Sequence, residues 1–87
     1  MANINVTSIG AREFEVVVGG DSTHRVTVPE DLTAELGLQE DDLEGVVRES
    51  FLFLLEREPA SSILPAFSLD VIPNYFPEYR EELPGRL

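Results

Sequence analysis

Residues 41–59, DDLEGVVRESFLFLLEREP, decide the fold because they form the one long segment with helical periodicity. Asp41 or Asp42 starts the predicted helix; Asp41 as N-cap with Glu44 three residues later approximates a capping box. Pro59 lacks an N–H and disfavours helical backbone at the residue before it, so we expect the helix to end there.

The two halves of this predicted helix differ in their apolar surface. The first half is amphipathic, and one broad apolar face carries Leu43, Val46, Val47, Phe51, Phe53 and Leu54. Residues 51–55, FLFLL, are apolar nearly all round, because Leu55 widens the apolar arc and Leu52 falls inside the polar one. Such a helix must be covered on more than one side. We expect a sheet on one side, and on the other either the C-terminal segment or a second copy of the chain.

Three segments before this helix alternate between apolar and polar residues, at 2–9, 12–18 and 23–28. Gly10 and the cluster Gly19-Gly20-Asp21-Ser22 separate them as turns. The pattern predicts a three-stranded antiparallel meander with 2–9 at an edge. One face is apolar and carries Phe14, Val16, Val18, His24, Val26 and Val28. The opposite face carries Glu13, Glu15, Thr23, Arg25 and Thr27, and Arg25 is expected to pair with a glutamate across strands.

Prolines organise the rest of the chain. Pro29 at the start and Gly37 just past the end delimit a short helix with Leu32 and Leu36 on its inner edge. Five prolines between residues 59 and 84 exclude another long helix, so we expect short ones capped by Ser61 or Ser62 and by Ser68, with a kink or 3₁₀ piece at Pro73. Residues 63–79 should pack on the second side of the central helix, and residues 80–87 should be a frayed tail.

The predicted fold is therefore α+β, as a single domain over residues 1–87. It consists of a three-stranded antiparallel meander (1–28), a short helix and a long central helix (29–58), and short proline-interrupted helices that wrap the central one (59–79).

Composition limits the classes of function. The chain has no cysteine, which excludes disulfides and thiol chemistry, and no run of about 18 apolar residues or charged-then-apolar leader, so we expect a cytoplasmic protein without a membrane segment. The net charge is −11 with arginine as the sole cation. An acidic surface repels phosphate backbones and attracts basic partners, although acidity also serves solubility alone.

Residues that could carry chemistry have simpler structural explanations. His24 is the only histidine, and metal sites normally need several converging ligands. The glycine pair at residues 19–20 fits a hairpin turn, and Glu40, Asp41, Asp42 and Glu44 lack the ligand spacing of a calcium loop. Ser61 and Ser62 have no adjacent base. We therefore predict no catalytic, metal or cofactor-binding residues and no enzymatic activity.

Two resemblances bear on these hypotheses. FLFLLEREPASSIL and AFSLDVIPNYFPEY resemble the signature FxFLLEREPxxSIL…YFPEY of a family of small bacterial and archaeal proteins with no assigned activity. This resemblance, over roughly residues 46–79, implies that 61–79 is a built part of the domain. HRVTVPEDLTAELGL with the longer helix after it resembles ribbon-helix-helix DNA-binding proteins, which implies Thr23, Arg25 and Thr27 as base-reading residues on a strand that pairs between two chains.

The candidate interface consists of large apolar residues near the end of the chain and on the central helix. Aromatic residues are enriched at protein interfaces. Three aromatic residues lie beside proline and acidic residues near the end of the chain, and two leucines of the central helix complete the candidate set: Leu52, Leu55, Tyr75, Phe76 and Tyr79. Closing the core is the alternative role of the aromatic residues. We expect a homodimer through this set. The first functional hypothesis is a non-catalytic interaction or regulatory module that binds a basic protein partner, as an antitoxin does; the second is a ribbon-helix-helix-like DNA-binding regulator, which the negative charge disfavours.

Overall fold

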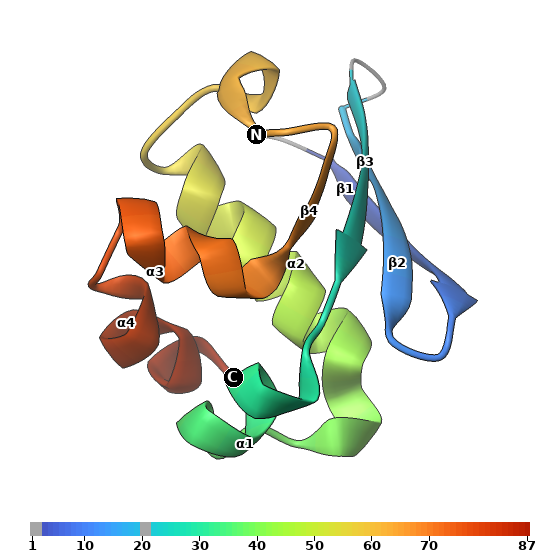
Figure 1. Ribbon diagram of the computed structural model, residues 1–87. Coiled ribbons are helices and arrows are strands. Elements are labelled where there is room, and N and C mark those ends of the chain that lie inside the picture. Colours follow the sequence, from blue (N-terminus) through green and yellow to red (C-terminus); the bar gives the residue numbers. More distant parts are fainter. Residues whose placement is uncertain (1–2, 20–21) are drawn as a thin grey trace.

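The computed structural model describes residues 3–19 and 22–87. It has an α+β fold, as predicted, in which the helices gather on one side of a four-stranded sheet (Figure 1). The strands are β1 (Ile4–Gly10), β2 (Glu13–Val18), β3 (Ser22–Thr27) and β4 (Ala66–Ser68). The helices are α1 (Glu30–Leu36), α2 (Leu43–Leu55), α3 (Ile72–Tyr75) and α4 (Tyr79–Arg86), with 3₁₀ helices at Glu40–Asp42, Ala60–Ser62 and Leu69–Val71.

The first three strands form the predicted antiparallel meander, with β1 at an edge. The expected apolar face is buried, including His24, whereas Ile4 and Val6 of β1 are only half-buried. Arg25 lies opposite Glu15 in the register of β2 and β3, but the expected ion pair is not formed, because the ion pairs of the described residues involve only the other five arginines. Ala2 of the predicted first strand, and Gly20 and Asp21 of the predicted turn, lie outside the described residues.

Strand β4 was not predicted from the sequence. It runs parallel to β3, with Val26 opposite Phe67, and completes the order β1-β2-β3-β4. The Arg25 N–H donates to the Pro65 carbonyl at 2.8 Å, which extends this pairing to the residue before the strand. The short helices expected after Pro59 are present, and β4 is an addition to them. Three residues between Pro65 and a 3₁₀ helix carry no alternation that a sequence pattern can detect.

Helix α2 begins one residue later than a cap at Asp41 would place it. Asp42 is the N-cap, and its carboxylate accepts from the Gly45 N–H at 3.3 Å. A Cβ at Gly45 would come within 2.5 Å of this carboxylate, so glycine leaves the room that the cap needs. The helix ends at Leu55, before Pro59, and the Arg57 N–H bonds three residues back to the Leu54 carbonyl, as in the tightened last turn of many helices.

The apolar end of α2 is covered on two sides by the same chain. On one side, the Phe51 ring lies 5.4 Å from the His24 ring on β3 and 6.0 Å from the Phe67 ring on β4. On the other side, the Phe53 ring meets the rings of Phe76 and Tyr79 edge-on, at 6.1 and 5.2 Å. Both phenylalanines are fully buried. The C-terminal segment therefore provides the second cover in cis.

The C-terminal residues are ordered to the end of α4. The expected frayed tail at residues 80–87 is wrong, because α4 spans Tyr79–Arg86 and buries Leu83 completely. Upstream, the expected 3₁₀ piece is present at Leu69–Val71, and Pro73 lies in the first turn of α3, where its missing N–H costs nothing. Ser68 occupies the N-cap position of that 3₁₀ helix without a side-chain hydrogen bond, and Ser61 and Ser62 lie inside another.

Arg57 joins the end of α2 to α4. Its guanidinium donates to Glu78 at 3.1 Å, to Glu82 at 2.8 Å and to the Phe53 carbonyl at 3.1 Å, and it lies 3.7 Å over the Phe53 ring. A backbone hydrogen bond, followed by this guanidinium, lowers the pKa of the Glu78 carboxyl. Arg86 adds a second contact, to Glu56 at 2.7 Å. Because the guanidinium fork binds several acceptors at once, α4 is fixed by charge as well as by packing.

Within the described residues, no helix has the length and apolar character needed to cross a membrane.

Phe51→Ala tests whether α2 is the centre of the core. Truncating a buried phenylalanine costs about 3–5 kcal/mol, a large part of the roughly 5–15 kcal/mol that holds a small domain folded. We expect chemical denaturation to show that loss, and Tyr75→Ala, at an aromatic residue that is 69% exposed, to stay close to the native value. Equal losses of stability in the two variants would contradict the placement of α2 at the centre of the core.

Candidate protein-docking groove

An apolar groove lies between the C-terminal end of α2 and the chain from Ser62 to Phe76. Its volume is ≈ 220 Å³, and it is lined by Leu54, Glu58, Ser62, Ile63, Leu64, Phe67, Val71, Ile72, Tyr75 and Phe76. This is smaller than the roughly 300–1,000 Å³ of typical small-molecule sites. The groove therefore has room for a large side chain but not for a bulky cofactor.

His24 fixes one wall of the groove. Its Nδ1 lies 2.7 Å from the Leu64 carbonyl, and since a carbonyl oxygen only accepts, Nδ1 carries the proton. Its Nε2 lies 2.9 Å from the Ser22 hydroxyl, which can bond to it as donor or acceptor. The histidine is buried, so these bonds hold the chain at Leu64 against the sheet. Leu64, which is 49% exposed, is thus a fixed part of the surface.

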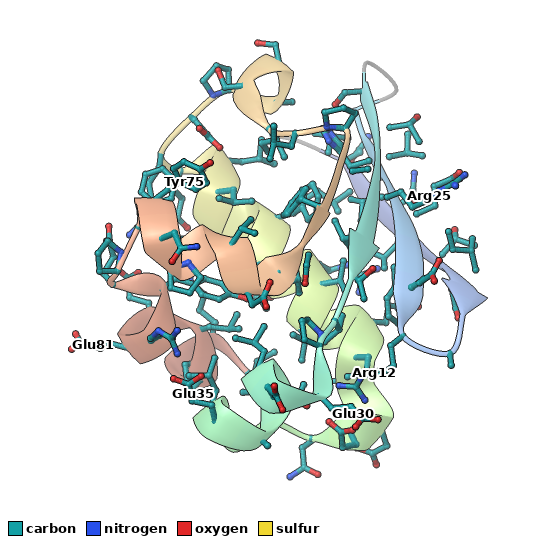
Figure 2. The ribbon with its side chains drawn as sticks, viewed as in Figure 1. Arg12, Arg25, Glu30, Glu35, Tyr75 and Glu81 are labelled. Atoms are coloured by element: carbon teal, nitrogen blue, oxygen red, sulfur yellow. The ribbon has the colours of Figure 1, made fainter. Side chains whose placement is uncertain are left out.

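Two of the five predicted interface residues meet at this groove. Tyr75 is 69% exposed and lies at the end of α3, at the outer surface beside α2 (Figure 2). Phe76 is half-buried, and its ring contacts that of Phe53 in the core. One residue thus presents an open aromatic surface, and its neighbour connects that surface to the core.

The other three predicted interface residues lie elsewhere. Tyr79 is fully buried, and its hydroxyl is 2.7 Å from the Ser50 hydroxyl, so it belongs to the core. Burial raises the pKa of Tyr79 to about 12, although the hydrogen bond with Ser50 acts in the opposite direction. Leu55 is half-buried against the core, whereas Leu52 is half-buried outside the core cluster, and neither lines the groove.

Sequence analysis missed the walls contributed by Leu64, Phe67 and Val71. The available signal was the apolar density of residues 63–79, which exceeds what a solvated tail needs. It does not show which side chains face outward, because the prolines interrupt any helical or strand period.

Charge around the groove is negative. Five of the six arginines are within ion-pair distance of a carboxylate, namely Arg12, Arg48, Arg57, Arg80 and Arg86. Arg12, for example, donates to Glu40 at 2.6 Å and lowers the pKa of that carboxyl through this hydrogen bond. Glu58 lines the groove with no arginine or histidine within 4.0 Å among the described residues, and Asp70 is exposed in the 3₁₀ helix that leads into α3.

The predicted DNA-contacting residues are exposed on the face of the sheet that no helix covers. Thr23, Arg25 and Thr27 alternate along β3 with the buried residues, and Figure 2 shows Arg25 pointing away from the helices. However, β3 pairs with β2 on one side and β4 on the other. It therefore offers no edge for the pairing between two chains that the ribbon-helix-helix arrangement needs.

The described part of the chain gathers no metal site, since no three His, Asp or Glu side chains converge there. The hydroxyls at the groove, Ser62 and Tyr75, are accompanied by one carboxylate, Glu58. Both ring nitrogens of His24 are occupied by structural hydrogen bonds. The groove is therefore suited to contact with an apolar group, with the carboxylate of Glu58 beside it.

Comparison of the chain with models of protein families, with curated proteins and with solved structures gave no match.

The buried Tyr79 predicts a loss of stability in alkali. Unfolded tyrosine releases its proton near pH 10, whereas folded Tyr79 holds it to about pH 12, so the free energy of unfolding falls as the pH rises between these values. At about 1.4 kcal/mol per pKa unit, the fall is roughly 3 kcal/mol.

Denaturation at pH 9 to 12 measures this fall. Tyr79→Phe should lower stability at neutral pH but remove most of the alkaline fall, whereas Tyr75→Phe should keep it. An alkaline fall of equal size in both variants would place its origin outside Tyr79.

Proposed function

We propose that the protein is a non-catalytic interaction module whose groove binds an apolar side chain of a basic protein partner. The single observation that carries the proposal is the groove itself, in which Leu64 and Tyr75 are exposed large apolar residues and the wall at Leu64 is held by His24. Large exposed apolar residues in a shaped hollow are typical of interface anchor sites.

The electrostatic surroundings support a positively charged partner. The chain carries a net charge of −11, Glu58 lines the groove, and Asp70 is exposed next in the chain to the lining residue Val71. A lysine or arginine flanking the inserted side chain would pair with these carboxylates, and the overall field would speed encounter. Neutralisation of a basic protein, as an antitoxin neutralises its toxin, is one role that this chemistry serves.

A DNA-binding regulator is the second candidate, because Thr23, Arg25 and Thr27 share one exposed face. That face also carries Glu13 and Glu15, and a single arginine supplies few phosphate contacts. DNA binding measured by fluorescence anisotropy, and lost in Arg25→Ala, would favour this candidate over the first.

Two matched leucines test the docking groove. Leu64 lines the groove and Leu87 lies outside it, and each is 49% exposed. We expect the native chain and Leu87→Glu to co-purify one basic protein from lysates of the source cells, and Leu64→Glu to lose it. Because the contact is partly ionic, NaCl should weaken capture.

The same capture experiment can reject the proposal. Equal capture by the Leu64→Glu and Leu87→Glu variants would place any partner elsewhere on the surface. Capture that is indifferent to salt would remove the electrostatic part of the argument.

A further inference from the structure

Strand β1 leaves one side of its backbone without a partner strand. It is the first strand of the order β1-β2-β3-β4, so β2 is its only neighbour in the described sheet. The Gly19 N–H donates to the Asn3 carbonyl at 2.7 Å, which sets the phase of the ladder. In an antiparallel pair the bonded residues alternate, so Asn5 and Thr7 bond to β2, while the N–H and C=O groups of Ile4, Val6 and Ser8 point to the free side.

The sequence of this edge strand lacks the usual features that prevent pairing. Exposed edge strands normally carry charges, prolines or a central bulge, or are very short. Residues 3–10, NINVTSIG, contain no charge and no proline, although 26% of the whole chain is charged. The one irregularity lies between Ser8 and Gly10, which leaves residues 4–8 regular.

The opposite edge of the sheet is protected in the ordinary way. Strand β4 has three residues, follows Pro65 directly and is succeeded by a 3₁₀ helix. The sheet therefore has one edge that resists extension and one that is regular, neutral and open. This asymmetry assigns any added strand to β1.

We propose that β1 pairs with β1 of a second copy of this chain, antiparallel, about a two-fold axis at Val6. In this register Val6 exchanges both backbone hydrogen bonds with Val6 of the second copy, and Ile4 pairs with Ser8 of the second copy. The three free residues of each edge are then all bonded. Two sheets of four strands become one continuous sheet of eight.

A second copy fits this edge better than an unrelated strand. Antiparallel pairing of identical strands is closed by two-fold symmetry, so each edge satisfies the other and no open edge remains there. Two chains with a net charge of −11 approach with less repulsion along an edge strand that carries no charged residue. Ile4 and Val6 are half-buried, and the added strand would cover their exposed parts. The inference does not rest on the groove, because β1 and β4 are opposite edges.

Sedimentation analysis of matched variants tests the pairing. The native chain should dimerise, and NaCl should strengthen the dimer because it screens repulsion between like charges, the opposite of its effect on a basic partner. Val6→Pro removes an N–H that faces away from β2 and should weaken the dimer at least tenfold. Val6→Ala keeps that N–H and should remain a dimer.

Hydrogen exchange of the native chain gives a test that requires no variant. The amides of Val6 and Ser8 should become protected as protein concentration rises, whereas those of Asn5 and Thr7, bonded to β2, should be protected throughout. A native chain that stays monomeric with Val6 and Ser8 open overturns the proposal. So does a dimer whose affinity is the same in native protein and in a folded Val6→Pro.

Discussion

The structure depends on covering a helix end that is apolar on every side. Phe51 and Phe53 lie on α2 two residues apart and are both fully buried, so they need partners in nearly opposite directions. The β3–β4 side supplies His24 and Phe67, and the C-terminal segment supplies Phe76 and Tyr79. The many prolines after Pro59 suit this task, because a chain of short turns can wrap a helix more closely than another long helix can.

A few arginines hold the wrapped segments in a strongly acidic chain. Arg57 bonds to α4 and to the last turn of α2, and Arg12 bonds to the Val28 carbonyl, Thr33 and Glu40, so that it ties the β1–β2 turn to α1. Each guanidinium therefore joins segments far apart in the sequence. The carboxylates that pair with no arginine, including Glu58, give the surface its negative charge. The same small number of arginines that holds the fold together therefore leaves a surface suited to a basic partner.

The sequence predicted what local patterns encode and missed what depends on distant contacts. Alternation identified the three-stranded meander, and helical periodicity with Pro59 identified α2. Strand β4 is a parallel pairing of three residues far from β3 in the chain, so no local pattern signals it. Tyr79 was left between a core role and an interface role, because composition alone cannot separate an aromatic residue in the core from one at the surface; the burial of Tyr79 and its contact with Ser50 place it in the core. The groove itself was not predicted; two of its lining residues, Tyr75 and Phe76, were named from the sequence as part of a candidate interface.

The central claim is that α2 requires the cover supplied by the chain after Pro59, and removing that part of the chain tests it most directly. A chain that ends after Glu58 keeps the meander, α1 and α2 but loses β4, α3 and α4. Circular dichroism during heating is the measurement. The account predicts no cooperative transition for the shortened chain, with restoration when residues 59–87 are added as a separate peptide. A cooperative transition of the shortened chain alone, near the temperature of the full chain, would contradict it.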